Sequence, residues 1–264
     1  MVSIADFFFA YIQECINNIY QVMLMKHLIN YAHYFIITLI IIGLVFIIPF
    51  DDTPVNSIAT ESPLIIIDAG HGGKDGGAVA SDGTQEQYLN LAIALDMYEY
   101  LNNLGYRTLL TRSDDDSIHD EGAESIREQK VSDIHNRLHI MKDNPGCIFV
   151  SVHQNYYTES KYNGTQVFYS PNDSSSPVLA QYIQDSVVST LQPDNTRQIK
   201  NCDDSIYLLY NATETAVLVE CGFLSNEEER EKLKNEKYQA EFAVAVCNGI
   251  ISYINSAEEI TTDF

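Results

Sequence analysis

Beyond residue 63 the chain alternates between short apolar runs and longer stretches in which apolar residues recur every three or four positions. The short runs are typical of strands buried in a sheet, and the longer stretches are typical of amphipathic helices. The predicted strands cover residues 64–68, 106–111, 147–152, 164–169 and 216–219, and the predicted helices cover residues 86–103, 124–142, 177–191, 227–235 and 239–255. Because strands alternate with helices, we expect an α/β fold with a mostly parallel central sheet and helices on both faces.

The N-terminal part has a different pattern. Residues 28–50 form a stretch of 23 residues without a charged side chain. At about 1.5 Å rise per residue, a helix of this length spans the roughly 30 Å hydrocarbon core of a bilayer. Lys26 precedes the stretch and Asp51 follows it, so the positive-inside rule places the N-terminus in the cytoplasm and the later residues outside. We therefore predict a transmembrane signal-anchor, and a signal peptide cleaved near residues 57–59 is the alternative.

These patterns divide the chain into five predicted segments. They are a cytoplasmic segment at 1–27, the transmembrane helix at 28–50, a polar linker at 51–63, a folded domain at 64–256 and an acidic tail at 257–264. Residues 1–24 contain no Lys or Arg, although a signal-anchor usually begins with a short basic stretch. Residues 1–24 are therefore either an over-called extension ahead of Met25 or a second, interfacial helix.

Charge and composition narrow the class of partner. Of the 264 residues, 37 are Asp or Glu and 15 are Lys or Arg, which gives a formal net charge of −22. Such an acidic excess argues against nucleic acid as the main partner. A hydrophobic content of 45% excludes a disordered chain.

The five cysteines are scattered, so we expect them to be small buried hydrophobic residues rather than parts of a disulfide framework or a cysteine metal site.

Four residues capable of metal chemistry stand where predicted strands end or a helix begins. His71 lies in a glycine-rich loop after the first strand, His153 and Glu220 follow later strands, and Glu86 opens the first helix. A catalytic zinc site needs three such ligands, an open position for water and a nearby carboxylate that moves the proton. The residues alone leave two alternatives open: unrelated polar residues at strand ends, or a phosphate-binding glycine loop. Against the second alternative, the glycine-rich loop around His71 is not followed by the Lys-Ser/Thr pair that a phosphate-binding loop of the Walker type carries.

Longer motifs point to one family. Residues 64–256 resemble the zinc-dependent N-acetylmuramoyl-L-alanine amidases of the amidase-3 type. The matching segments are residues 66–78, Glu86 with Asn90 and Leu91, Thr111-Arg112, Arg137, residues 148–155 and residues 217–226. The resemblance implies that His71, Glu86 and His153 bind one Zn²⁺ per chain and that Glu220 is the catalytic acid/base. Residues 64–256 are then the catalytic domain.

Other polar residues are weaker candidates. Arg137 and Asn155 lie within the matching motifs, and we expect them to bind or orient the substrate. His135 and His139 are spaced four apart on a predicted helix and could share a metal. A surface pair beside Arg137 is the favoured interpretation of these two histidines.

The resemblance implies hydrolysis of the amide bond between N-acetylmuramic acid and L-alanine in peptidoglycan. Residues 125–137, Gly164 to Tyr169 and residues 206–208 are most similar to the germination-specific amidase of spore formers, which acts in formation of cortex muramic-δ-lactam. The alternatives are a general cell-wall amidase of growth or division, a zinc peptidase that cuts within the stem peptide, or a non-catalytic wall-binding protein. We also expect a single-pass cell-membrane location with the catalytic domain outside the cytoplasm, facing the forespore cortex, and an accessory activating or localising protein.

Overall fold

The fold is built around a six-stranded sheet. The structure is a computed structural model that describes residues 25, 31, 33 and 62–262. Its strands are β1 (Ile65–Ala69), β2 (Thr108–Leu110), β3 (Ile148–Asn155), β4 (Gln166–Tyr169), β5 (Lys200–Asn201) and β6 (Thr215–Phe223). Their order across the sheet is β2-β1-β3-β6-β4-β5. All neighbouring pairs are parallel except β4 and β6, so the sheet is mixed but mostly parallel, as the sequence predicts.

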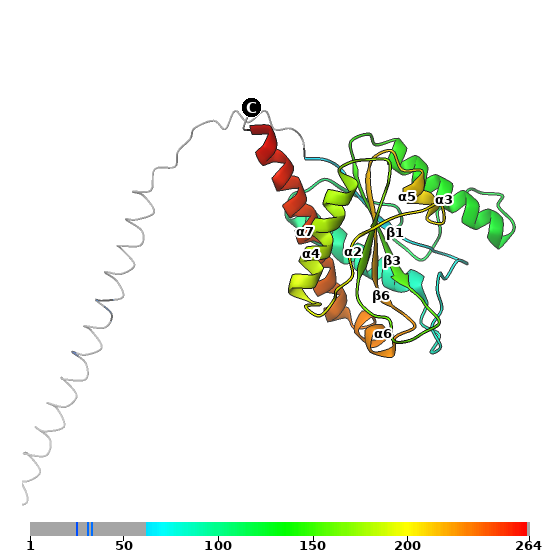
Figure 1. Ribbon diagram of the computed structural model, residues 1–264, viewed down its shortest axis with the longest axis horizontal. Coiled ribbons are helices and arrows are strands. Elements are labelled where there is room, and N and C mark those ends of the chain that lie inside the picture. Colours follow the sequence, from blue (N-terminus) through cyan, green and yellow to red (C-terminus); the bar gives the residue numbers. More distant parts are fainter. Residues whose placement is uncertain (1–24, 26–30, 32, 34–61, 263–264) are drawn as a thin grey trace, which may run out of the picture. The chain divides into compact units, whose positions relative to one another are not determined.

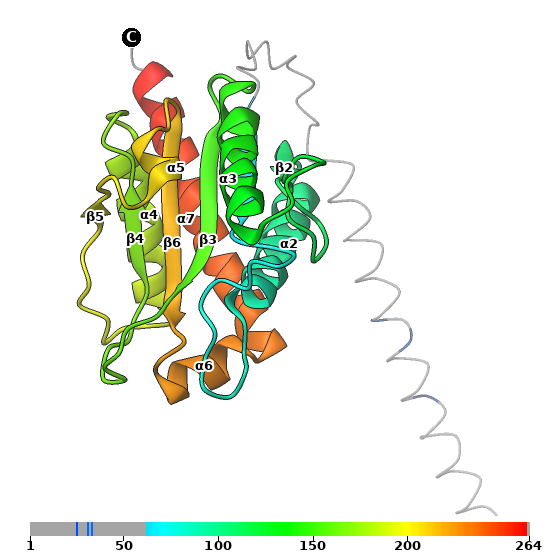
Figure 2. The same ribbon diagram turned by 90° about the vertical axis from the view of Figure 1, so that its right-hand side faces the viewer.

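Helices cover both faces of the sheet, which confirms the predicted layers. They are α2 (Glu86–Asn103), α3 (Ile126–Lys142), α4 (Ser176–Thr190), α5 (Tyr207–Tyr210), α6 (Glu227–Leu233) and α7 (Glu236–Thr262). Figure 1 shows the sheet nearly edge-on, with α2, α4 and α7 on one side and α3 and α5 on the other. Figure 2 shows the sheet from the side that carries α3 and α5.

Alternate side chains of each central strand pack into two separate cores. In β1, Ile65 and Ile67 belong to the larger core beneath α2, α4 and α7, whereas Ile66 belongs to the core beneath α3 and α5. Because helices cover both faces, all five residues of β1 are buried. This double coverage explains why the central strands appear in the sequence as continuous apolar runs rather than as alternating patterns.

The observed elements differ from the predicted ones mainly at their ends. The predicted strands 147–152 and 216–219 continue to Asn155 and Phe223, so His153 and Glu220 lie inside strands rather than beyond them. The polar residues there interrupt the apolar run without ending the backbone pairing. The last helix runs from Glu236 to Thr262 and so includes part of the predicted tail. The short elements β5 and α5 were not predicted, because two or four residues carry no periodicity.

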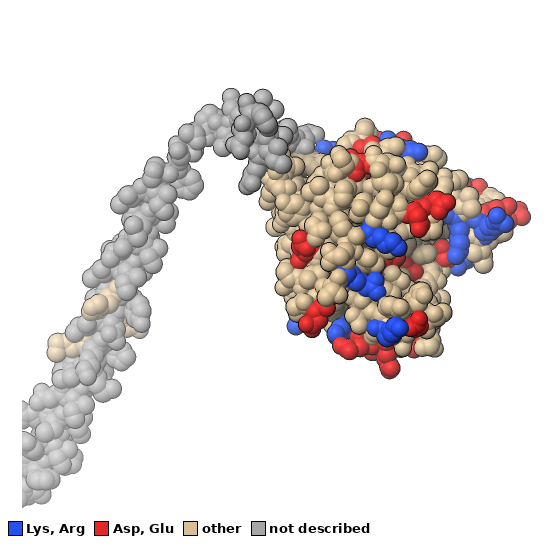
Figure 3. All heavy atoms as spheres, viewed as in Figure 1, with Lys and Arg blue, Asp and Glu red and all other residues tan. Residues whose placement is uncertain are grey.

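The predicted transmembrane stretch at 28–50 lies outside the described residues except for Tyr31 and His33, and of the rest of residues 1–61 only Met25 is described. Within the described part of the chain, no helix combines the length and apolarity that a bilayer crossing requires. Of the five cysteines, the four at 147, 202, 221 and 247 are free and buried, as predicted, and Cys15 is outside the description. On the face of residues 62–262 seen in Figure 3, basic side chains are interspersed with acidic ones.

Candidate metal centre and its cavity

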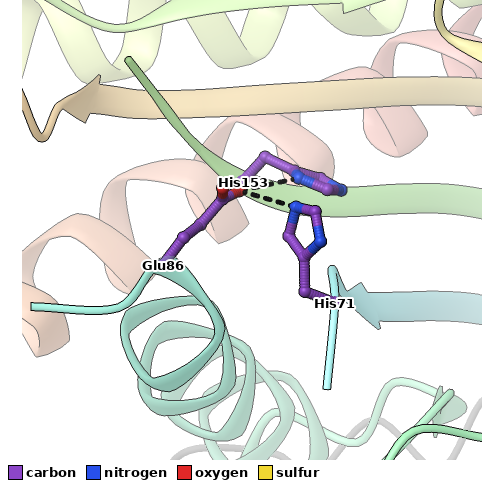
Figure 4. Close-up of side chains that lie close together, drawn as sticks. All are labelled: His71, Glu86 and His153. Atoms are coloured by element: carbon purple, nitrogen blue, oxygen red, sulfur yellow. Dashed lines mark hydrogen bonds and ion pairs between the residues drawn. The ribbon is translucent and has the colours of Figure 1, made fainter. Parts of the chain in front are cut away.

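Three candidate residues from distant parts of the chain meet at the carboxyl edge of the sheet. His71 lies in the loop after β1, Glu86 is the first residue of α2, and His153 lies near the end of β3. Their ligand atoms all lie within 4.8 Å of one another, and theirs is the one group of this kind among the described residues. Oε1 of Glu86 is 2.9 Å from His153 Nδ1 and 3.3 Å from His71 Nε2 (Figure 4).

Glycines let these side chains approach one another. A Cβ on Gly70 would lie 2.2 Å from Nε2 of His153, and one on Gly77 would lie 2.6 Å from Oε2 of Glu86. Gly77 also has a φ of 67°, and His71 itself adopts a φ of 63°, which is uncommon for a residue with a side chain. The glycine-rich loop is therefore required by the packing of the centre as well as by its turn.

The carboxylate of Glu86 is held in its charged form. Its oxygens accept hydrogen bonds from the backbone N–H groups of Ala78 (2.8 Å) and Gln154 (3.0 Å). Burial opposes ionisation, but the contacts with His153 and His71 outweigh it and keep the pKa of Glu86 well below its ordinary value. The position at the start of α2 also favours a negative charge. Glu86 is thus a fixed anionic group that is available to bind a metal.

Asp75 orients His71 from the opposite side of the ring. Its Oδ2 is 2.9 Å from His71 Nδ1, and its Oδ1 is 2.7 Å from Lys130 Nζ. Nδ1 donates to Asp75, so Nε2 is the nitrogen that faces Glu86 and that can bind a metal once it has lost its proton. Burial would lower the pKa of His71, but Asp75 and Glu86 raise it to about 9. Burial would raise the pKa of Asp75, but its contacts with His71 and Lys130 hold this pKa below its ordinary value.

Glu220 stands beside this centre. It is paired with His153 in the parallel register of β3 and β6, and both line the same cavity. Its Oε2 atom is buried and has no hydrogen-bond partner. Burial and the nearby negative charge of Glu86 raise the pKa of Glu220 to about 8. A carboxyl group with these properties can hold or release a proton near neutral pH.

A cavity of about 400 Å³ opens in front of these residues. Its lining includes residues of α3, residues 205–208 around the start of α5, and residues at the carboxyl edge of the sheet. The lining residues are Asp68, Gly70, His71, Asp75, Lys130, Asp133, Ile134, Arg137, His153, Ser205, Ile206, Tyr207, Leu208, Leu218 and Glu220. The two histidines of the candidate metal centre therefore border a hollow that has both acidic and apolar walls.

Arg137 lies beneath the cavity with its guanidinium engaged on every side. It pairs with Asp68 and, at 2.7 Å, with Asp133, and it donates to the carbonyls of Ala69 and His71, both at 2.7 Å. These contacts, with a second one to Asp133, use all five N–H groups. Its buried position fixes the backbone of the His71 loop. Substrate binding by Arg137 remains a prediction, and the structure shows no donor left for it.

The other weaker candidates lie apart from the centre. Asn155 is the last residue of β3, is half-buried and does not line the cavity, so its substrate role also remains a prediction. His135 and His139 form no metal-competent group within the described residues. The ring of His135 instead lies 5.4 Å from that of Tyr207, which agrees with the favoured surface interpretation.

The sequence analysis did not identify Asp75 and Lys130 as site residues. An acidic residue four positions after a candidate ligand histidine was the available signal for Asp75. Lys130 had no comparable signal, because the packing of α3 against the His71 loop brings it to Asp75.

Comparison with known proteins gives a consistent result. Residues 65–252, which contain the four principal candidates, match the amidase-3 family, described as N-acetylmuramoyl-L-alanine amidase. The germination-specific N-acetylmuramoyl-L-alanine amidase of Bacillus subtilis is 32% identical over 197 residues, which cover 75% of this chain and 82% of that protein. The structure of the CwlD amidase from Clostridioides difficile, in complex with the GerS lipoprotein, is 39% identical with a TM-score of 0.71; the match covers 74% of this chain and 99% of that one. The crystal structure of an N-acetylmuramoyl-L-alanine amidase from Clostridium difficile 630 is 27% identical with a TM-score of 0.65. This match covers 75% of the present chain and 99% of that one.

Proposed function

The chain belongs to the N-acetylmuramoyl-L-alanine amidase family, and from this premise we propose that it uses zinc, with Glu220 as the proton carrier. The activity of the family is hydrolysis of the amide that joins N-acetylmuramic acid to the stem peptide of peptidoglycan. The observation that carries the proposal is the convergence of His71, Glu86 and His153 beside the unpartnered oxygen of Glu220.

The donor set fits zinc. Two imidazole nitrogens and one carboxylate oxygen are ligands that Zn²⁺ takes in catalytic sites, and three protein ligands leave a position open for water. When bound, zinc polarises the scissile carbonyl and lowers the pKa of water toward ~7. Asp75 supports this fit, because a histidine ligand commonly donates its second N–H to a carboxylate.

The residues of the chain then have separate tasks in the reaction. Glu220 accepts the proton of the attacking water and returns it to the leaving nitrogen of L-alanine. Its pKa of about 8 lies close to neutral pH, so both the protonated and the ionised form are accessible for the two halves of this transfer. Asp75 holds His71 in the required tautomer, and Arg137 holds the backbone carbonyl of His71 in place.

The full chain in mild detergent, incubated with purified muropeptides, provides the direct test. Mass spectrometry should show an intact stem peptide with N-terminal L-alanine, and metal analysis should show one zinc per chain. His153→Ala should lose both zinc and activity. Full activity in a metal-free preparation would contradict the zinc assignment.

We further propose a role in the spore cortex. The identity of 32% with the germination-specific amidase of Bacillus subtilis supports this role. Deletion of the gene in a spore-forming host should abolish cortex muramic-δ-lactam without changing vegetative growth. A growth or division defect with normal cortex would instead support the general cell-wall alternative.

An accessory protein and a membrane location complete the proposal. The CwlD amidase of Clostridioides difficile is described in complex with the GerS lipoprotein, and this supports an extracytoplasmic protein partner for the present chain. The uncharged stretch at 28–50 supports a single-pass anchor with the catalytic domain outside the cytoplasm. Affinity purification of the full chain from sporulating cells should recover such a partner in the membrane fraction.

A further inference from the structure

A single lysine connects the metal centre with the α3 wall of the cavity. Nζ of Lys130 lies 2.7 Å from Oδ1 of Asp75, the carboxylate that orients His71. The lysine side chain is 50% exposed, so the ion pair does not seal it from the cavity that it lines. An ammonium group has three N–H donors. The contact with Asp75 therefore leaves Lys130 with N–H donors that can bind a second anion.

No other cation in the described cavity lining outside the metal centre has a free donor. All five N–H groups of Arg137 are engaged by Asp68, Asp133 and backbone carbonyls. The remaining charged groups of the lining, apart from the histidines, are carboxylates. An anionic group of a bound substrate is consequently attracted to Lys130 and repelled by the other charged walls.

The covalent structure of the substrate decides which half enters the cavity. The scissile amide must lie between the metal centre and Glu220. A glycan strand continues in both directions from each muramic acid, so it has to cross the rim, whereas the stem peptide is a branch that can enter. Ile134, Ile206 and Leu208 line the cavity and offer an apolar surface for the methyl group of L-alanine.

Resting on the proposed function, we propose that Lys130 binds the free α-carboxylate of the second residue of the stem peptide. This residue is a D-glutamate joined through its γ-carboxyl group, so its α-carboxyl group is either free or amidated. Lys130 is two contacts away from His71, through Asp75. His71, Asp75 and Lys130 line the same cavity, and a peptide advances about 3.5 Å per residue, so a stem peptide whose first amide is at the metal centre extends its next residue along this wall. Lys130 then favours the acid form of the substrate over the amide form.

The test uses the zinc-loaded full chain and two soluble muropeptides that differ only in this group, α-carboxylate or α-amide. The parent should have the higher kcat/KM on the acid form. Lys130→Met removes the charge at similar length, and kcat/KM on the acid form should fall roughly five- to tenfold, mainly through KM. The amide form should be much less affected, and Lys130→Arg should restore the preference.

Lys232→Met is the matched control. Lys232 is 53% exposed and pairs with Glu228 at 2.8 Å, but it lies on α6 and outside the cavity. Replacement of Lys232 should leave kcat/KM unchanged on both the acid form and the amide form. Equal loss on the acid and amide forms in Lys130→Met would show that the lysine acts only through Asp75 and would overturn the proposal. Zinc content is measured on the same samples, and a parent that cleaves neither muropeptide at the muramoyl–alanine bond overturns the proposed function as well.

Discussion

At the scale of single residues, the centre depends on one carboxylate oxygen. Oε1 of Glu86 contacts both His71 and His153, while Asp75 fixes the first of these rings from behind. Glu220 differs from them because its Oε2 has no partner. This contrast separates the proposed ligands, whose positions are fixed, from one carboxyl group whose oxygen is unpartnered, as the proposed proton carrier requires.

Glu220→Gln should therefore separate catalysis from metal binding. Glutamine keeps the size of the side chain but cannot accept the proton, so the rate should fall by about 10²–10⁴-fold. Zinc content should stay at the parent value because no ligand is lost. Loss of zinc comparable to that of His71→Ala would require Glu220 to be reassigned as a ligand, with Glu86 as the acid/base.

The pH dependence of stability gives an independent check on Glu220 in the metal-free protein. Its pKa in the folded state is raised to about 8 by burial and by Glu86. A raised carboxyl pKa means that the folded state binds more protons, so the stability it contributes is complete below the unfolded pKa and is lost as pH rises toward 8. Urea unfolding at pH 5.5 and pH 8 should show that Glu220→Gln gains stability relative to the parent at the higher pH. An equal difference at both values would contradict the shift.

Asp75→Asn tests the orientation of His71. The substitution keeps the size but removes the charge that holds Nδ1–H, and loss of such a partner commonly lowers metal affinity by about 10–100-fold. Competition with a chromogenic chelator measures this directly. Asp194→Asn, an exposed acid away from the cavity lining, is the control. Unchanged affinity in Asp75→Asn would remove Asp75 from the set of supporting residues.

At the scale of elements, α3 has to be held at its start because it supplies both Lys130 and Arg137 to the cavity. Its first turn has a capping box. Ser125 Oγ accepts from Glu128 N at 3.2 Å, and Glu128 Oε2 accepts from Ser125 N at 2.9 Å. These bonds satisfy two of the N–H groups that a helix start leaves unpaired.

Ser125→Ala should consequently lower the free energy of unfolding by about 1 kcal/mol. Ser189→Ala is the control, since that hydroxyl only donates within α4 to the carbonyl of Ser186, and it should stay within about 0.5 kcal/mol of the parent. Urea unfolding measures both. A cost no larger than that of the control would show that the cap does not hold α3.

At the scale of the whole molecule, the site residues all lie within residues 62–262, whereas the predicted anchor at 28–50 is described only at Tyr31 and His33. Full-length protein should sediment with membranes and resist alkaline carbonate, and residues 51–264 should remain soluble. Amino-terminal sequencing of the membrane form distinguishes the alternatives. A mature protein that begins near Thr60 would show that the stretch is a cleaved signal peptide.

The sequence by itself determined the layers of this fold and the identity of the principal candidate residues. Apolar periodicity depends on which residues are buried, and both faces of the central strands are buried, so the pattern was visible without coordinates. The motifs around His71, Glu86, His153 and Glu220 identified the family, whose match covers all four.

Only the tertiary structure decided how these residues act together. Strand register pairs His153 with Glu220, and the packing of α3 brings Lys130 to Asp75, more than fifty positions earlier in the chain. The buried setting of Arg137 was not evident from its motif, because an exposed guanidinium and one buried beneath a loop look the same in sequence. Long-range contacts of this kind depend on three-dimensional packing and leave no local periodicity, which is the physical reason that the sequence did not specify them.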